Sequence, residues 1–192
     1  QEARLTSLTQ GGLLAPSGDG LRLAFGSPLE RQVAYGRVSV NERATLHRQA
    51  AMAMDRALDD PEEVAAQFEA AGDVQSALEK LRQGANRYLD QKDRKRAIDC
   101  LKRTCQTAKS MPNEMARFSE DALLLSQLLS QSGASPEAAA LLTEAEKLTQ
   151  NGKDKRLWAQ LAGERARLMV ESNDFANADK RLVELVKVGQ EL

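Results

Sequence analysis

From residue 41 onward, apolar side chains recur every three or four residues, and short polar breaks interrupt this pattern. Such spacing is typical of amphipathic α-helices, whose apolar face returns about every 3.6 residues. The first of these helices is expected to run from Asn41, a favourable N-cap residue, to about Leu58. Seven more are expected at residues 62–71, 74–89, 94–108, 114–131, 136–150, 154–171 and 174–188. The pattern therefore predicts eight antiparallel helices joined by short loops.

The chain before residue 41 has a different pattern. A short amphipathic stretch comes first, then two short apolar runs around a Gly/Asp-rich turn, and then a segment that begins at Pro28. Apolar runs flanking such a turn predict a β-hairpin, and a proline is well placed in the first turn of a helix. The elements expected here are a helix at 1–9, a hairpin with strands at 13–15 and 21–25, and a helix at 28–35.

Small residues and polar turns recur together along the helical part. Ala77, Ala97, Ala138 and Ala178 each stand shortly after a polar turn, although the distances between them are uneven. A small residue near the start of a helix lets that helix pack closely on the one before it. We therefore expect these alanines to be buried where neighbouring helices meet.

This repeat resembles the tetratricopeptide repeat (TPR) over about residues 61–192. The small residue that the family has in its first helix is also present, as in Ala65 with Phe68 and Ala166 with Met169. The family's tryptophan and terminal proline are mostly missing, and Trp158 does not fall at the family's position. The resemblance implies a mainly α fold, a right-handed α–α superhelix of the TPR-like solenoid type. A plain helical bundle is the alternative.

The N-terminal part is similar to a recurring segment of bacterial signal-transduction ATPases. The similarity rests on Leu23-Ala24-Phe25, on residues 29–35 and on residues 43–51, with Gly26 where that family usually has a histidine. In those proteins such a segment joins a winged-helix module to TPR-like repeats. The resemblance implies that the hairpin is the wing of a small winged-helix remnant.

Together the two resemblances divide the chain into three parts and suggest what kind of protein it comes from. The parts are a partial winged-helix-like module at 1–40, a linking helix at 41–60 and TPR-like repeats at 61–192. Proteins with this arrangement often carry a Ser/Thr kinase or ATPase domain upstream. The 192 residues hold no Walker A loop and no kinase motif, so we expect this piece to be non-catalytic.

Charge and composition bear on the kind of partner. The chain has 27 Lys and Arg against 28 Asp and Glu, and this balance disfavours a dedicated nucleic-acid-binding protein. No apolar run approaches the roughly 20 residues of a membrane span, and no signal-peptide pattern is present. We expect a cytoplasmic protein, and the start at Gln1 suggests a piece of a longer chain.

Residues able to carry metal, redox or catalytic chemistry are scarce. Cys100 and Cys105 lie close together on one predicted helix but point in different directions, which disfavours a bond between them. The single histidine, His47, has no cluster of ligands near it and is expected to be a packing residue. On the hairpin, Arg22 is the only positive charge, which favours a structural wing over a DNA-reading one. We expect no cofactor and no metal.

Polar residues on predicted first helices are the candidate binding residues. Such helices line the concave surface of a solenoid, and long or amide side chains there can pair with acidic or backbone groups of a peptide. The alternative is that they are solvated or pair with nearby glutamates. The candidates are Arg82, Asn86, Arg87, Arg165 and Arg167.

The sequence thus favours a non-catalytic protein-interaction scaffold, the repeat region of a larger cytoplasmic signalling regulator with a protein or peptide partner. Two alternatives remain open. One is a nucleic-acid-linked regulatory module that uses the winged-helix part. The other is a structural spacer between catalytic domains. A basic stretch at 92–103 is interrupted by Asp93 and Asp99, and a solvated helix face is the favoured interpretation of it.

Overall fold

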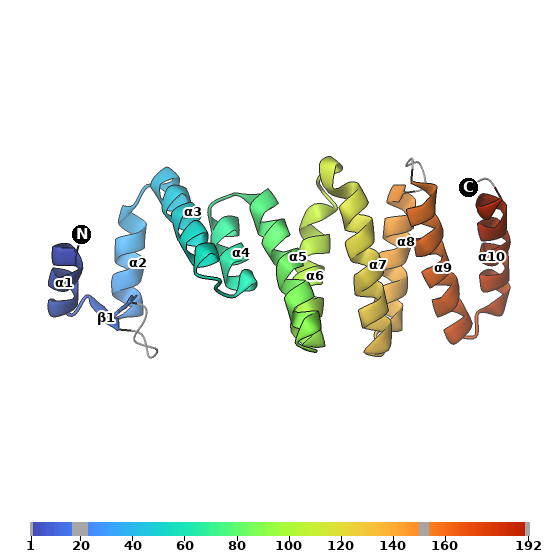
Figure 1. The fold of residues 1–192 in the computed structure, drawn as a ribbon, viewed down its shortest axis with the longest axis horizontal. Helices are drawn as coiled ribbons and strands as arrows, with labels where there is room; N and C mark the ends of the chain where they lie inside the picture. The colour runs from blue at the N-terminus through green and yellow to red at the C-terminus, as the bar shows by residue number, and fades with distance from the viewer. Residues whose placement is uncertain (1, 17–22, 150–153, 191–192) are drawn as a thin grey trace.

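The computed structural model describes residues 2–16, 23–149 and 154–190, and in these residues the chain is mainly helical (Figure 1). Two short strands, β1 (Leu14–Pro16) and β2 (Leu23–Phe25), form the expected antiparallel hairpin, with Ala15 opposite Ala24. A 3-10 turn, η1 (Pro112–Glu114), precedes α7. The α-helices are α1 (Glu2–Gln10), α2 (Pro28–Arg37), α3 (Val40–Arg56), α4 (Pro61–Ala70), α5 (Val74–Asp90), α6 (Arg94–Ala108), α7 (Met115–Gln131), α8 (Ser135–Thr149), α9 (Lys155–Glu171) and α10 (Phe175–Gly189).

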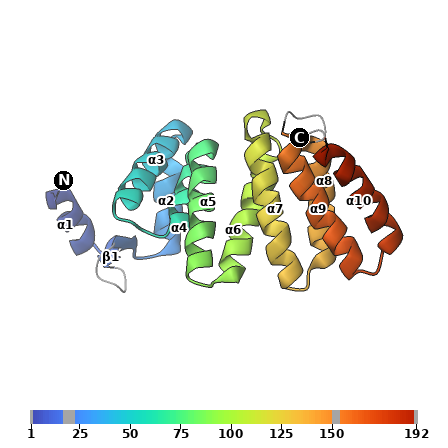
Figure 2. The same ribbon diagram turned by 45° about the vertical axis from the view of Figure 1, so that its right-hand side comes forward.

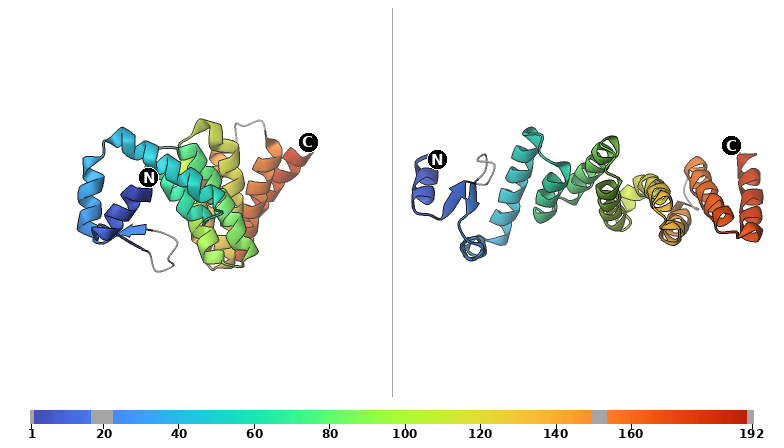
Figure 3. Two further views of the ribbon diagram at one scale, coloured as in Figure 1. Left: turned by 60° about the vertical axis from the view of Figure 1, so that its left-hand side comes forward. Right: turned by 90° about the horizontal axis from the view of Figure 1, so that it is seen from below.

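The helices from α3 onward stack along one long axis, and each packs mainly against its neighbours in the sequence (Figures 1 and 2). The two ends of the chain lie at opposite ends of the stack, and the path between them zigzags (Figure 3). This arrangement is an α-solenoid of antiparallel helical hairpins. The predicted mainly α, TPR-like solenoid with one small hairpin is therefore confirmed.

Helix lengths reveal the repeating unit. The helices α3, α5, α7 and α9 each have 17 residues, and α6, α8 and α10 each have 15. We call the 17-residue group the first helices and α4, α6, α8 and α10 the second helices. The first helices α5, α7 and α9 begin at Val74, Met115 and Lys155, so their starts are almost evenly spaced. This period is longer than the roughly 34 residues of a standard tetratricopeptide unit.

One type of turn joins most successive helices. The backbone has a positive φ at Leu58, Gly72, Lys92, Gly133 and Asn173, each of which is the second residue after the last helical one. At Gly72, between α4 and α5, the Gly72 N–H donates to the Glu69 carbonyl at 2.9 Å, and the next N–H donates to the Phe68 carbonyl at 2.9 Å. This pair of bonds is the Schellman motif, which satisfies carbonyls that the end of a helix leaves free. The chain thereby reverses within a very short turn.

The alanines expected at close helix contacts are buried. Relative exposure is 2% for Ala77, 0% for Ala97, 0% for Ala138 and 2% for Ala178. Ala97 and Ala138 belong to a continuous apolar core that runs from α4 to α9, with Tyr88 and Phe118 as its largest members. Ala77 packs in a smaller cluster with Ala51, Val64 and Phe68. A methyl side chain at these positions lets the helices approach closely enough to bury such neighbours.

The start of α3 differs from its prediction. Asn41 lies inside the helix, and the N-cap is Ser39. The Ser39 hydroxyl accepts from the Glu42 N–H at 3.3 Å, and the Glu42 carboxylate accepts from the Ser39 N–H at 3.1 Å. This reciprocal capping box satisfies two backbone donors, whereas Asn41 as the cap would satisfy one. The prediction of Asn41 as the cap was wrong for that reason.

The segment before α3 is attached loosely to the solenoid. The α2 helix buries no residue, and the turn at 17–20 and Arg22 lie outside the described residues. Tyr35 supplies the main link: its hydroxyl lies 3.0 Å from His47 Nε2, and His47 Nδ1 lies 2.8 Å from Gln67 Oε1. The guanidinium of Arg43 stacks 4.8 Å from the centre of the Tyr35 ring. His47 is thus a packing and bridging residue between α2, α3 and α4. Among the described residues, no helix is long and apolar enough to cross a membrane.

Candidate functional site

Arg82, one of the candidate binding residues, lies between two first helices. Its Nη2 is 2.8 Å from Glu114 Oε2, and its Nε donates to Asp121 Oδ2 at 2.8 Å. Gln75 completes the cluster by donating from Nε2 to Glu114 Oε1 at 2.7 Å. Only 13% of the Arg82 side chain and 4% of the Glu114 side chain are exposed. Arg82 therefore joins α5 to η1 and α7 within the molecule.

Ionisation in this cluster follows burial and pairing. Burial raises the pKa of the Asp121 carboxyl, and the facing Arg82 charge only partly opposes this. Burial also acts to raise the pKa of Glu114, but hydrogen bonds from Gln75 and Arg82 outweigh it, and the pKa lies below its usual value. Burial disfavours the charge on Arg82, yet the two carboxylates outweigh this and raise its pKa. Arg82 thus stays charged because both acids face it.

The two candidates on α9 are also paired. Arg165 Nη1 donates to Glu146 Oε2 at 3.0 Å, and this glutamate, on α8, is almost fully buried. Arg167 donates to Glu164 at 2.6 Å and also pairs with Glu171, one turn further on. Both arginines pair with acidic residues of their own chain. This is the alternative to partner binding given above, in which the candidates pair with nearby glutamates.

Asn86 and Arg87 are different. Both are exposed on α5, and within the described residues neither side chain has a hydrogen bond or ion pair. The structure places them, together with Arg82, on one helix, and it places Arg165 and Arg167 on α9, with α7 between the two helices. The five candidates do not form one pocket.

The repeat period relates these helices and adds a residue that the sequence analysis missed. Asn86 is the thirteenth residue of α5, and Gln127 and Arg167 hold the same place in α7 and α9. Gln127 is half-buried and has no partner within the described residues. Asn86, Gln127 and Arg167 form what we call the polar row, one side chain on each of the first helices α5, α7 and α9. The nearly constant spacing between the starts of these helices is the signal that could have identified Gln127.

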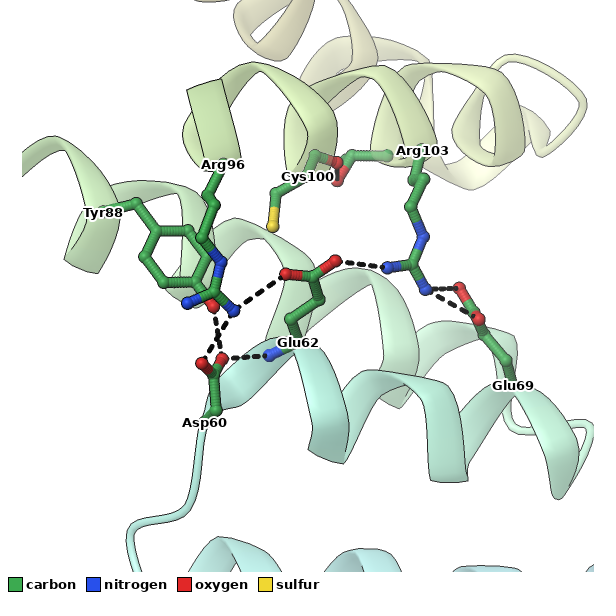
Figure 4. A network of polar contacts seen from close by, with 8 residues as sticks. Asp60, Glu62, Glu69, Tyr88, Arg96, Cys100 and Arg103 are labelled. Atoms are coloured by element: carbon green, nitrogen blue, oxygen red, sulfur yellow. Dashed lines mark hydrogen bonds and ion pairs between the residues drawn. The ribbon is translucent and has the colours of Figure 1, made fainter. Parts of the chain in front are cut away.

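A second polar network joins α4, α5 and α6 (Figure 4). Asp60, the N-cap of α4, accepts from the Glu62 N–H at 3.1 Å and from the Tyr88 hydroxyl. Arg96 crosses the Tyr88 ring at 4.0 Å and donates to Asp60 at 2.7 Å. Arg103 continues the network and lies between Glu62 and Glu69, as Figure 4 shows. The arrangement ties three successive helices together.

Several cations of the basic stretch at 92–103 have acidic partners within the chain, and the two thiols of the same helix are buried. Arg96, Arg103 and Lys102 all pair with carboxylates of the chain, Lys102 with Glu137 at 2.8 Å. Burial raises the pKa of the Cys100 thiol to about 11. Burial likewise raises the pKa of Cys105 to about 12, so both thiols are protonated and weakly nucleophilic at neutral pH. In the described residues, no group of three or more His, Cys, Asp and Glu side chains is arranged to hold a metal ion.

Several grooves open between helices, and the volumes of four of them run from about 380 to about 620 Å³. One of about 380 Å³ lies between α6 and α8, where Phe118 and Leu125 of α7 contribute apolar side chains. Ion pairs from α6 to α8 border it, including Lys109 with Glu144 at 3.5 Å. These residues belong to the packing between successive units.

Comparisons with known proteins give a limited answer. No protein-family model matches the chain, and no curated protein matches it. Two crystal structures of putative kinesin light chain nearly identical TPR-like repeats from Podosopora anserina are similar to it. One, a point variant, is 17% identical, covers 84% of this chain and 91% of its own, and gives a TM-score of 0.47. The other is 16% identical, covers 100% and 97%, and gives the same TM-score of 0.47. At these values the likeness carries no argument, and the fold rests on the helix packing described above.

Proposed function

We propose that this chain is a non-catalytic protein-interaction scaffold that binds an extended segment of another protein along its first helices. The polar row supports the proposal most directly, because Asn86 and Gln127 present unpaired amides at equivalent places on successive helices of the described chain. An amide side chain both donates and accepts, so it can pair with the backbone of an extended peptide whatever its sequence. The exposed Arg87 beside Asn86 would favour an acidic side chain in that peptide.

We also propose the wider setting. The similarity of residues 23–51 to the linking segment of bacterial signal-transduction ATPases supports a division into a winged-helix-like module at 1–40, a linking helix at 41–60 and repeats at 61–192. On this proposal the chain is the repeat region of a larger cytoplasmic signalling regulator with a kinase or ATPase domain elsewhere. The scaffold would then bring a partner protein to that domain.

A displayed library of random peptides, selected on the full chain, tests the binding proposal. We expect the selected peptides to bind at least about tenfold more weakly to Asn86→Ala and to Gln127→Ala, since each removes an amide worth about 1.5 kcal/mol of hydrogen bonding. Gln106→Ala is the matched control, because it removes an exposed amide from the second helix α6. Peptides whose affinity is the same for all three variants would remove the first helices from the binding surface.

The same preparation distinguishes the alternatives. Retention of duplex DNA at physiological salt would favour the nucleic-acid-linked module. A selection that yields no binding peptide, together with no DNA binding, would favour the structural spacer.

A further inference from the structure

The turn between α5 and α6 carries a group of exposed cations. Lys92 lies in the turn itself, and Arg94 and Lys95 are the first two residues of α6. We call these three residues the basic tip. All three are exposed, and none of their side chains has a hydrogen bond or ion pair within the described residues. The turn lies at the lower edge of the stack in Figure 1, in the middle of the chain.

The other cations of α6 serve the contacts between helices. Arg96, Lys102 and Arg103 each pair with a carboxylate from outside α6, at 2.7, 2.8 and 2.9 Å. Arg94 and Lys95 belong to the same helix, yet neither reaches an acid of the described chain. The packing of the solenoid therefore does not account for the basic tip.

Each member of the basic tip stands where its local structure disfavours it. The amino end of a helix carries partial positive charge, so the first turn favours acids and disfavours cations. The α6 helix nevertheless begins with three cations in succession, and it has no acid in its first turn. Lys92 has a φ of 62°, in the left-handed region, where glycine or asparagine has a lower steric cost.

The other second helices show that these places do not require cations. None of them has a cation among its first two residues, and α4 and α8 have acids in the first turn. The turns before α8 and α10 have Gly133 and Asn173 at the place of Lys92. A local cost that the fold does not require is typical of residues retained for function.

We propose that the basic tip docks an acidic segment of a partner protein, one that presents aspartate or glutamate side chains. The planar guanidinium of Arg94 can donate two parallel hydrogen bonds to a carboxylate, and the lysine ammonium groups can follow a second and third acid. This surface contains no residue of the polar row. The proposal therefore goes beyond the proposed function and does not rest on it.

Two aspartates near the basic tip favour a protein segment over a nucleic acid. Asp90 ends α5, and Asp93 caps α6 by accepting from the Arg96 N–H at 3.2 Å. A nucleic acid has a phosphate at every nucleotide, so its backbone would also bring charge against these aspartates. A protein segment can place carboxylates opposite the cations and neutral residues opposite the aspartates. The net charge of −1 also gives no long-range attraction for a polyanion.

The densest run of acids in this sequence is already engaged within the chain. Residues 59–63 read Asp-Asp-Pro-Glu-Glu. Asp60 and Glu62 pair with Arg96, and Asp59 and Glu63 also have partners. A second copy of the folded chain would have the same run engaged in the same way. A separate protein is therefore the source that the structure favours for the acidic segment.

Fluorescence anisotropy with labelled octaglutamate, added to the full chain, tests this proposal. We expect saturable binding that weakens as sodium chloride is added, and no binding of octaglutamine. Arg94→Glu and Lys95→Glu should each weaken binding about fivefold or more, since each replaces an attraction by a repulsion. Arg156→Glu is the matched control, because it reverses an exposed cation at the second residue of α9. It should leave the affinity unchanged.

The melting temperature, followed by circular dichroism, supplies a second readout. An acid in the first turn of a helix is favourable, so Arg94→Glu and Lys95→Glu should melt no lower than the wild type although they bind more weakly. A lower melting temperature would overturn the proposal, because these cations would then serve the fold.

Three binding results would also overturn it. The first is the absence of octaglutamate binding at low salt, and the second is equal weakening by Arg156→Glu. The third is tighter binding of duplex DNA that Arg94→Glu abolishes, because the tip would then bind a nucleic acid. Asn86→Ala should bind octaglutamate as the wild type does, so this proposal and the proposed function fail separately.

Discussion

Single charged residues in this chain mostly serve the contacts between units. Arg82 stands in α5, and its acidic partners Glu114 and Asp121 stand further along the chain, in η1 and α7. All three side chains are largely buried, so the arginine compensates two desolvated carboxylates at once. In this solenoid, the position of a long basic residue on a first helix therefore does not show that its side chain is available to bind a partner. Arg82 is also a poor choice for a binding test, because its replacement is expected to destabilise the fold.

Replacement of Arg82 by leucine is expected to destabilise the chain by about 3 kcal/mol, because it leaves two buried carboxylates without a cation. Urea denaturation followed by circular dichroism measures this. Arg87→Leu, at an exposed site further along α5, is the control and should change the unfolding free energy by less than about 0.5 kcal/mol. Equal effects of the two variants would show that the Arg82 pairs contribute nothing.

Asp60 gives a prediction that depends on pH. Burial acts to raise its pKa, but Tyr88, Arg96 and the Glu62 N–H together hold the pKa below the usual 3.8. A lowered pKa in the folded state stabilises the fold above the unfolded value and loses that contribution as the pH falls through the folded value. Asp60→Asn should therefore cost about 1–2 kcal/mol at pH 7.

The same variant should differ progressively less from the wild type as the pH falls below the usual value of 3.8 and then through the lower folded-state pKa of Asp60, where the folded carboxyl itself becomes protonated. Chemical denaturation at a series of pH values from neutral to acid measures the difference. A cost that stays constant throughout the acid range would mean that the carboxylate charge plays no part.

Among the elements, the helix ends carry the clearest local information. Five turns between helices have a positive φ, at Leu58, Gly72, Lys92, Gly133 and Asn173, and three of them have Gly or Asn there, the residues that adopt it most readily. Leu58, at φ 57°, and Lys92, at φ 62°, are the exceptions in this set. A lysine there has the steric cost of a left-handed residue that glycine avoids.

Lys92→Gly should stabilise the chain by about 0.5–1 kcal/mol, because relief of that cost exceeds the extra freedom of glycine in the unfolded state. The neighbouring Gln91→Gly is the control, since Gln91 has an ordinary φ of −80° and should only lose stability. The midpoint of urea unfolding compares the two. A lower midpoint for Lys92→Gly would contradict the assigned backbone.

Periodicity and turn residues were enough to predict the helices, the hairpin and the buried alanines. They could not show which two helices form one repeat unit, because the Gly72 turn that joins α4 to α5 looks like the turns inside the hairpins. The alternation of 17-residue and shorter helices in the structure shows which helices pair. The ion pairs of Arg82 and Arg165 lay beyond the sequence, since their partners are distant in the chain and become neighbours only once helices of known register stack. From the sequence alone, pairing within the chain and binding of a partner were both possible roles for these arginines.

At the scale of the whole molecule, stability depends on contacts between neighbouring helices. Solenoids of this kind are nearly one-dimensional, so each unit is stabilised by the units on either side. The continuous core spans α4 to α9, whereas α2 buries no residue and α10 buries only Ala178. Both ends of the described chain are therefore expected to open more readily than its middle.

Amide hydrogen exchange, resolved along the full chain, measures how far each helix is stabilised by its neighbours in the stack. We expect the slowest exchange in α5 to α8, faster exchange in α10, and the fastest in α1 and α2, because exchange follows the free energy of local opening. An α10 helix as protected as α6 and α8, or uniform exchange from end to end, would contradict a solenoid in which each helix of the described chain is stabilised by its neighbours.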